Sequence, residues 1–112
     1  MKRGEVRWYR FASPDKRRPV LVLTRDSVLE YLGEVTVAPI TTTVRRIPSE
    51  VALGAPDGMP RDCAVNLDHL QTVAKGRLGT VIATLSGDRM LEVRRALLFA
   101  LGFYRGGPEP SG

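Results

Sequence analysis

The chain of 112 residues contains a single cysteine, Cys63, and a single histidine, His69. One cysteine excludes an internal disulfide, and this scarcity fits a protein kept in the reducing cytosol. A zinc site draws three or four ligands mostly from cysteine and histidine, so we expect no zinc site here. Carboxylates, histidines and cysteines do not cluster at ligand spacing anywhere in the chain. We therefore expect that the protein uses no metal and no cofactor.

Long hydrophobic runs are also missing. No apolar run approaches the roughly 18 residues that a membrane-spanning helix needs, and residues 1–7 lack the apolar stretch of a signal peptide. We expect a cytoplasmic protein without a membrane partner. The length and the hydrophobic share of 43% suit one domain with one core. We assign residues 1–104 to that domain and expect residues 105–112, rich in glycine and proline, to be a disordered tail.

Acidic residues are scarce at the start of the chain. The first 18 residues hold only Glu5 and Asp15 against seven basic residues, and this surplus equals the net charge of the whole chain, +5. The basic block leads directly into the apolar run Pro19–Leu23. A positive cluster at the start of a rigid strand suits a phosphate backbone, although a solubilising arm would have the same composition. The seven residues are Lys2, Arg3, Arg7, Arg10, Lys16, Arg17 and Arg18.

Hydrophobic patterning predicts a mainly β fold with a C-terminal helix. The helix follows from Met90, Val93, Leu97 and Leu101 at helical spacing, with a capping serine before them and a glycine after them. We expect the arginines of this segment to face outward. The sheet should form a small antiparallel barrel, or a half-open sheet, that the helix covers. The predicted strands are residues 4–11, 19–24, 35–40, 50–53, 63–73 and 78–85, and the predicted helix is residues 86–102.

Three details of the sheet are predicted from local signals. Pro39 indicates an edge strand or a bulge, because proline cannot donate to a strand ladder. Residues 63–73 read as one bent strand, in which Asn66 and Asp68 would lie on the same face. The Lys75-Gly76 step indicates a hairpin that leads into the last strand.

Several stretches of the sequence occur in an order and spacing that single out one family. They are Lys2–Val6, Arg17–Leu23, Val37–Thr41, Pro48–Val51 and Arg61–Val73. Together they resemble the MazF/PemK/Kid family of bacterial toxins over residues 2–103. The resemblance implies an SH3-like, plasmid-maintenance-toxin barrel that works as a homodimer. It further implies an endoribonuclease that cuts single-stranded RNA at specific sequences, arrests translation and growth, and binds an acidic antitoxin protein.

Arg18 and Thr41 match the catalytic arginine and threonine of that family. RNA cleavage through the 2′-hydroxyl passes through a phosphorus centre that carries extra negative charge. A guanidinium held beside Pro19 can donate two parallel hydrogen bonds to that charge. The threonine hydroxyl can donate to a phosphoryl oxygen.

Asp68 matches an aspartate that some family members use in the site, whereas Asn66 replaces an arginine. Asp68 can accept a proton from the 2′-hydroxyl or contact a base edge, and we include it among the catalytic residues. His69 would point to the opposite face of the strand and reads as a core or rim residue. Arginine stays protonated, so it is a poor general base, and the sequence identifies no general base.

The residues predicted to bind RNA surround this catalytic set. Of the aromatic residues near the N-terminus, Trp8 and Tyr9 must face opposite sides of a strand, so at most one of them can stack on a base. The first loop departs from the family, because Ser13–Lys16 replaces a Gly-Ser-Glu-Gln-like stretch, which bears on the RNA sequence that is recognised. The predicted RNA-binding residues are Trp8, Lys16, Arg17, Thr42, Arg45 and Asn66.

Two other functions remain open at this stage. A toxin of the same fold could bind DNA gyrase, as CcdB-like proteins do. Such toxins carry key contacts at an aromatic-glycine-aliphatic C-terminus, and this chain ends in Pro108–Gly112. A non-catalytic barrel could bind RNA without cutting it, although the matches at Arg18 and Thr41 argue against that.

Overall fold

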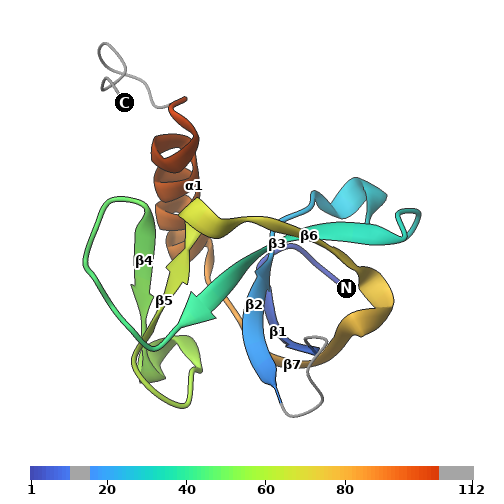
Figure 1. The fold of residues 1–112 in the computed structure, drawn as a ribbon, viewed down its shortest axis with the longest axis horizontal. Helices are drawn as coiled ribbons and strands as arrows, with labels where there is room; N and C mark the ends of the chain where they lie inside the picture. The colour runs from blue at the N-terminus through green and yellow to red at the C-terminus, as the bar shows by residue number, and fades with distance from the viewer. Residues whose placement is uncertain (11–15, 104–112) are drawn as a thin grey trace.

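The computed structural model of the protein describes residues 1–10 and 16–103. Their strands form a curled sheet, a half-barrel, and α1 stands at one side of it next to β4 and β5 (Figure 1). The mainly β fold with a C-terminal helix is thus confirmed. The predicted tail 105–112 and most of the first loop lie outside the described residues. The elements are β1 (Glu5–Arg10), β2 (Arg17–Val22), β3 (Glu34–Thr41), β4 (Glu50–Leu53), β5 (Cys63–Asn66), β6 (Gln71–Ala74), β7 (Leu78–Thr84) and α1 (Gly87–Leu101).

β3 is the central strand of the sheet. One edge pairs with β2, and the other pairs with β6 through residues 34–37 and then with β5 through Ile40 and Thr41. Pro39 lies in the interval between these two partners. Of the two predictions for Pro39, the edge strand is wrong, because β3 has partners on both sides. The change of neighbouring strand supplies a position at which a residue without an N–H is tolerated.

Residues 63–73 are not one bent strand, as we predicted, but two strands joined by a 3₁₀ turn at Leu67–His69. The Asn66 side chain accepts a hydrogen bond from the backbone N–H of Asp68, 3.0 Å away, and so caps the turn. Asn66 and Asp68 consequently do not alternate along a strand. Before the turn, β5 pairs with Ile40 and Thr41 at the end of β3. After the turn, β6 pairs with residues 34–37 at the start of β3.

The predicted hairpin at Lys75-Gly76 is also wrong. A 3₁₀ turn at Lys75–Arg77 does join β6 to β7, but β6 pairs with β3 and β7 pairs with β1. The sheet order is β4-β5-β3-β2-β1-β7, with β6 beside β3. The barrel therefore stays open between β6 and β7.

The helix ends as the sequence predicts. The Ser86 hydroxyl accepts from the Arg89 backbone N–H at 3.2 Å, and Gly102 closes the helix with a φ of 78°. Val93 and Ala96 are buried against the sheet. We expected Arg89 to face solvent. Instead, its guanidinium contacts Asp57 at 2.8 Å.

The core has two clusters, and β2 separates them. Leu21 faces the cluster that α1 covers, whereas Val20 and Val22 face the second cluster, between β2, β3 and β6. A strand buried on both faces must be apolar throughout, which explains the run Pro19–Leu23. Ile40, a buried residue of the first cluster, lines a groove on the surface, and the candidate site lies there.

Candidate functional site

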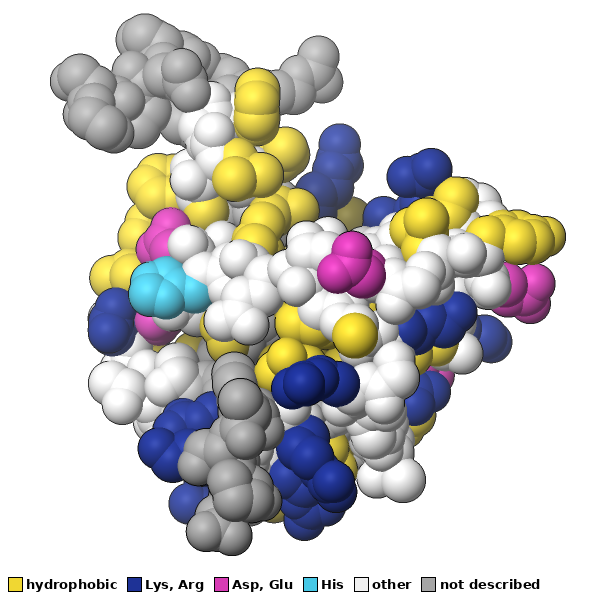
Figure 2. All heavy atoms as spheres, turned by 45° about the vertical axis from the view of Figure 1, so that its right-hand side comes forward, with side chains coloured by type: hydrophobic (Ala, Val, Ile, Leu, Met, Phe, Trp, Pro, Cys, Tyr) yellow, Lys and Arg dark blue, Asp and Glu magenta, His cyan; other side chains and the backbone are white. Residues whose placement is uncertain are grey.

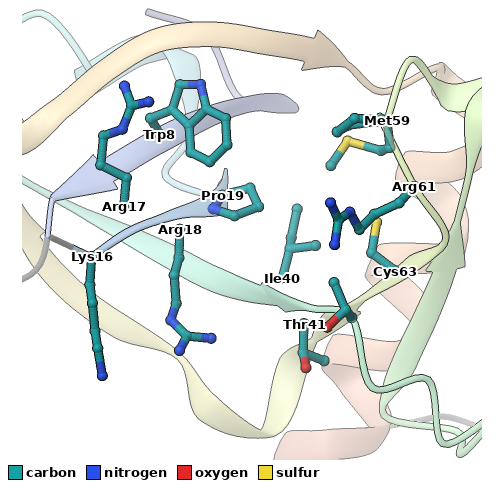
Figure 3. Close-up of a pocket in the computed structure, with 12 residues that line it drawn as sticks. Trp8, Lys16, Arg17, Arg18, Pro19, Ile40, Thr41, Met59, Arg61 and Cys63 are labelled. Carbon is teal, nitrogen blue, oxygen red and sulfur yellow. The ribbon is translucent and has the colours of Figure 1, made fainter.

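A groove of about 370 Å³ opens where the first core cluster reaches the end of the sheet. Its floor is apolar and consists of Pro19, Ile40, Met59 and Cys63 (Figure 3). Ile40, Met59 and Cys63 belong to the first core cluster, so the floor is anchored by packing. The remaining lining residues are Trp8, Lys16, Arg17, Arg18, Thr41, Thr42, Pro60 and Arg61.

Arg18 and Thr41 lie at the facing ends of β2 and β3. The last pair in the register of β2 with β3 is Val20 with Pro39. Continued by two residues, this register brings Arg18 opposite Thr41, and both residues line the groove. Residues opposite each other in an antiparallel pair share a face. In Figure 3 both side chains lie on the side of the strands away from Arg17 and Trp8. The Thr41 hydroxyl accepts from the Thr43 backbone N–H at 3.1 Å, which leaves its own proton to donate.

Trp8 forms one wall of the groove. The guanidinium carbon of Arg17 lies 5.0 Å from the centroid of the Trp8 ring, a cation–π contact. Tyr9 packs on the second core cluster instead, so the predicted opposition of Trp8 and Tyr9 is confirmed. The pair of Trp8 and Arg17 presents a flat, positively charged surface.

The charged side chains that line the groove are all cationic among the described residues. Four basic side chains line it, and no carboxylate of residues 1–10 or 16–103 does. All four are exposed, and within residues 1–10 and 16–103 none forms an ion pair. Figure 2 shows Lys and Arg side chains gathered at this end of the molecule, where β1 ends and β2 begins. The four are Lys16, Arg17, Arg18 and Arg61.

Arg61 is a site residue that sequence reasoning missed. It belongs to the segment Gly54–Asp62, which reads as a turn region, and its position depends on how that segment folds over the core. The one available signal was its place at the start of Arg61–Val73, one of the stretches that carry the family resemblance. Met59 and Pro60 reach the groove with it.

An ion pair holds this segment in place. The Arg89 guanidinium donates to Asp57 at 2.8 Å and to Glu92 at 2.9 Å. The hydrogen bond from Arg89 outweighs the effect of burial and holds the pKa of Asp57 below its ordinary value. The same carboxylate accepts from the Gly54 backbone N–H at 3.0 Å. Asp57 thus ties the segment that carries Arg61 to helix α1.

The other predicted residues divide around the groove. Thr42 lines it, as do Lys16, Arg17 and Trp8, whereas Asp68, Asn66 and Arg45 are not among the lining residues. The Asp68 carboxylate accepts from the buried Ser49 hydroxyl at 2.5 Å. The Arg45 backbone N–H donates to Glu50 at 2.9 Å. Catalysis by Asp68 and RNA binding by Arg45 and Asn66 stay predictions.

In the described part of the chain, no three or more His, Cys, Asp or Glu side chains are grouped closely enough to hold a metal ion. Burial raises the pKa of the Cys63 thiol, and the nearby carboxylates of Asp57 and Asp62 raise it further, so Cys63 acts as a floor residue in its neutral form. Among the residues that the structure describes, no helix is long and apolar enough to cross a membrane.

The fold and groove define a class: a small half-barrel with a cationic groove suited to a phosphate backbone. The sequence model of the "PemK-like, MazF-like toxin of type II toxin-antitoxin system" family matches residues 2–101, and the chain belongs to that family. The resemblance seen in the sequence is thereby confirmed.

Named relatives and solved structures agree with this assignment. The chain is 40% identical to the probable endoribonuclease MazF2 of Mycobacterium tuberculosis over 103 residues, 91% of this chain and 99% of that one. It is 42% identical to the probable endoribonuclease MazF5 of the same species, over 88% and 91% of the two chains. The fold matches the M. tuberculosis toxin MazF-mt6 with a TM-score of 0.79 and 37% identity, over 87% and 95%. A mycobacterial endoribonuclease solved in complex with its cognate antitoxin matches with a TM-score of 0.84 and 27% identity, over 95% and 99%.

Proposed function

We propose that the protein is a cytoplasmic endoribonuclease that cleaves single-stranded RNA through the ribose 2′-hydroxyl and thereby arrests translation and growth. The observation that carries this proposal is that Arg18 and Thr41 line the same groove, whose charged lining among the described residues is wholly cationic. The relatives named endoribonucleases support the same activity.

In the proposed reaction the 2′-oxygen attacks phosphorus, and the bond from phosphorus to the 5′-oxygen breaks. The 2′-hydroxyl proton leaves to a base, and the departing 5′-oxygen gains a proton. The products are a 2′,3′-cyclic phosphate and a 5′-hydroxyl. Arg18 donates two hydrogen bonds to the phosphoryl oxygens as their charge grows, and Thr41 donates a third. No residue role in this reaction requires a metal.

Trp8 and Arg17 hold the strand in register by stacking on an unpaired base. Lys16 and Arg61 contact phosphates, and Thr42 contacts the RNA strand beside Thr41. Stacking on Trp8 requires a base that is splayed out of a helix, which is why the proposed substrate is unpaired RNA.

The test uses a long single-stranded RNA and maps the cut ends. We expect cutting at a defined sequence in EDTA, with a cyclic phosphate on one product and a 5′-hydroxyl on the other. A single deoxyribose on the 5′ side of the scissile phosphate should leave binding intact and block cutting. Activity that disappears in EDTA, or efficient cutting of the deoxy-substituted strand, would show that this mechanism is wrong.

We propose an acidic antitoxin as the protein partner, because a cationic groove of this kind also attracts carboxylates. The mycobacterial relative solved with its antitoxin supports this partner. We also propose a homodimer, since α1 exposes Leu91 and Leu101 by 52% and 51%. Such an interface should bury on the order of 1,200–2,000 Å² in total. Light scattering that reports a monomer at micromolar concentration would contradict the dimer.

The gyrase-binding alternative is not favoured, since the named relatives are endoribonucleases. The binding-only alternative is decided by the cut-end experiment. RNA that is bound but never cut would favour it over the proposed enzyme.

A further inference from the structure

A second groove of about 700 Å³ lies on the other side of Trp8. The end of β1, the start of β2, and the turn from β6 into β7 enclose it. Trp8 and Arg17 line both this groove and the first one, so the two grooves share a wall. The remaining lining residues are Arg10, Gly76, Arg77, Leu78, Gly79 and Thr80.

This second groove has the same charge as the first. Three arginines line it, and none of the carboxylates that the structure describes does. Arg10, Arg17 and Arg77 are exposed, and among the residues that the structure describes they have no ion-pair partner. Exposed guanidinium groups without carboxylate partners can bind phosphates without first breaking an ion pair.

The backbone keeps the groove open. The pairing of β1 with β7 runs from Arg7 opposite Val81 to Tyr9 opposite Leu78, so β7 is irregular at Gly79 and Thr80, beside Trp8. A Cβ atom at Gly79 would lie 3.4 Å from the Cβ of Trp8, and longer side chains there would fill the space along the indole. Arg7 donates to the Gly79 carbonyl at 2.8 Å and holds this irregular segment in place.

We propose that the second groove binds the part of the RNA strand that extends beyond the cut site. Arg10 and Arg77 contact phosphates of this flanking segment, and the stacked pair of Trp8 and Arg17 lies at the point where the strand passes from one groove to the other. The inference rests on the proposed function, because it assigns a second binding segment to the same substrate. Phosphate contacts carry no sequence information, so this groove sets affinity for long strands and not the sequence that is cut.

The test compares Arg10→Gln/Arg77→Gln with Arg94→Gln/Arg95→Gln, a control that removes the same charge from exposed positions on α1. Binding is measured by fluorescence anisotropy on oligouridylates of about 4 and about 16 nucleotides. All proteins also carry Arg18→Ala, so that no RNA is cut. Circular dichroism checks that each variant is folded.

We expect the Arg10/Arg77 variant to bind the long strand more weakly, with a smaller loss on the short strand and none in the control. Two lost phosphate contacts should lower the log–log salt slope on the long strand by roughly 1.4. The ratio of the Kd of the variant to the Kd of its parent should then fall by about sevenfold between 50 and 200 mM salt.

Three results would overturn the inference. Equal losses on short and long strands would place Arg10 and Arg77 at the first groove. An unchanged Kd and salt slope on both strands would show that the second groove does not bind RNA. A loss confined to a polyglutamate peptide would assign the groove to an acidic protein partner. Because binding is measured apart from cleavage, a failure of the proposed enzyme activity leaves this result readable.

Discussion

The first 18 residues contain two kinds of basic side chain, and the structure separates them. Arg3 donates from its side chain to the Leu23 carbonyl at 2.8 Å, and its backbone N–H donates to Asp26. Arg7 pairs with Glu5 at 2.9 Å and also holds the Gly79 carbonyl. Arg17 and Arg18, in the same block, line the groove and have no carboxylate partner in the described part of the chain. The net charge of the block therefore overstates what reaches a ligand.

The difference comes from the strand positions of these residues. Arg3 and Arg7 lie where a carbonyl or a carboxylate is within reach, so each guanidinium donates at least one hydrogen bond inside the protein. Burial would raise the pKa of Glu5, but the Lys2 N–H and the Arg7 guanidinium outweigh it and the pKa lies below its ordinary value. Arg17 and Arg18 begin a strand at the rim, where water is the competing partner. The number of basic residues in a sequence cluster therefore does not tell how many of them can bind a ligand.

The largest effect should follow Arg18→Ala. Loss of a charge-assisted contact to the transition state should slow cleavage on the order of 10²-fold or more, with the fold intact because the side chain is exposed. Arg18→Lys should restore little activity, because a point charge cannot donate two parallel hydrogen bonds. Thr41→Ala should cost less, since it removes a neutral donor. Single-turnover cleavage measures all three, and near-normal cutting by Arg18→Ala would favour a protein that only binds RNA.

The salt dependence of RNA binding separates the two kinds of basic residue directly. Lys16→Gln/Arg17→Gln should lower the log–log slope by roughly 1.4 and leave the cut sequence unchanged. Arg3→Gln/Arg7→Gln removes the same charge and should leave the slope unchanged. Neither side chain lines the first or the second groove, and both donate hydrogen bonds inside the protein. Equal slopes for both double variants would show that only the total charge matters.

The Asp57–Arg89 pair should stabilise the folded protein, because it ties the segment that carries Arg61 to α1. Asp57→Asn should lower the free energy of unfolding by about 1–3 kcal/mol at pH 7, as expected for hydrogen bonds to charged groups. The Asp57 pKa is lowered by folding, so its stabilisation is present above about pH 4 and is lost as the pH falls through the lower, folded value. Urea titrations of both proteins at pH 7 and pH 3 should show a difference that shrinks in acid. A difference independent of pH would mean that the ion pair contributes no stability.

The smallest effect should come from Asp68→Asn. The Asp68 carboxylate accepts from the Ser49 hydroxyl, so we expect a loss of about 1 kcal/mol in stability and less effect on cleavage than Arg18→Ala. Ser49→Ala serves as the matched control, because it removes the same hydrogen bond and keeps the carboxylate. A loss of cleavage as large as that of Arg18→Ala, with Ser49→Ala active, would establish the catalytic role predicted from the sequence.

Local signals in the sequence predicted most elements correctly and misjudged where the chain changes partner. The caps at Ser86 and Gly102 and the buried run Pro19–Leu23 depend on neighbours in the chain, so their structure is readable from it. Residues 63–73 looked like one strand because apolar residues continue through the turn, and only the exchange of neighbours along β3 reveals the break. The hairpin at Lys75-Gly76 failed for a similar reason, since turn residues do not say which strands pair.

By itself, the sequence determined the fold class, the helix with its caps, the apolar run of β2 and the surplus of positive charge. These properties follow from periodicity, composition and short-range hydrogen bonds. Only the tertiary structure decided which cations are free, that Arg61 joins the groove, and that Asp68 lies outside its lining. Those outcomes depend on contacts between residues far apart in the chain, such as Arg89 with Asp57 and Arg7 with Gly79. Such contacts form only when the sheet and the helix are assembled, and no local pattern encodes them.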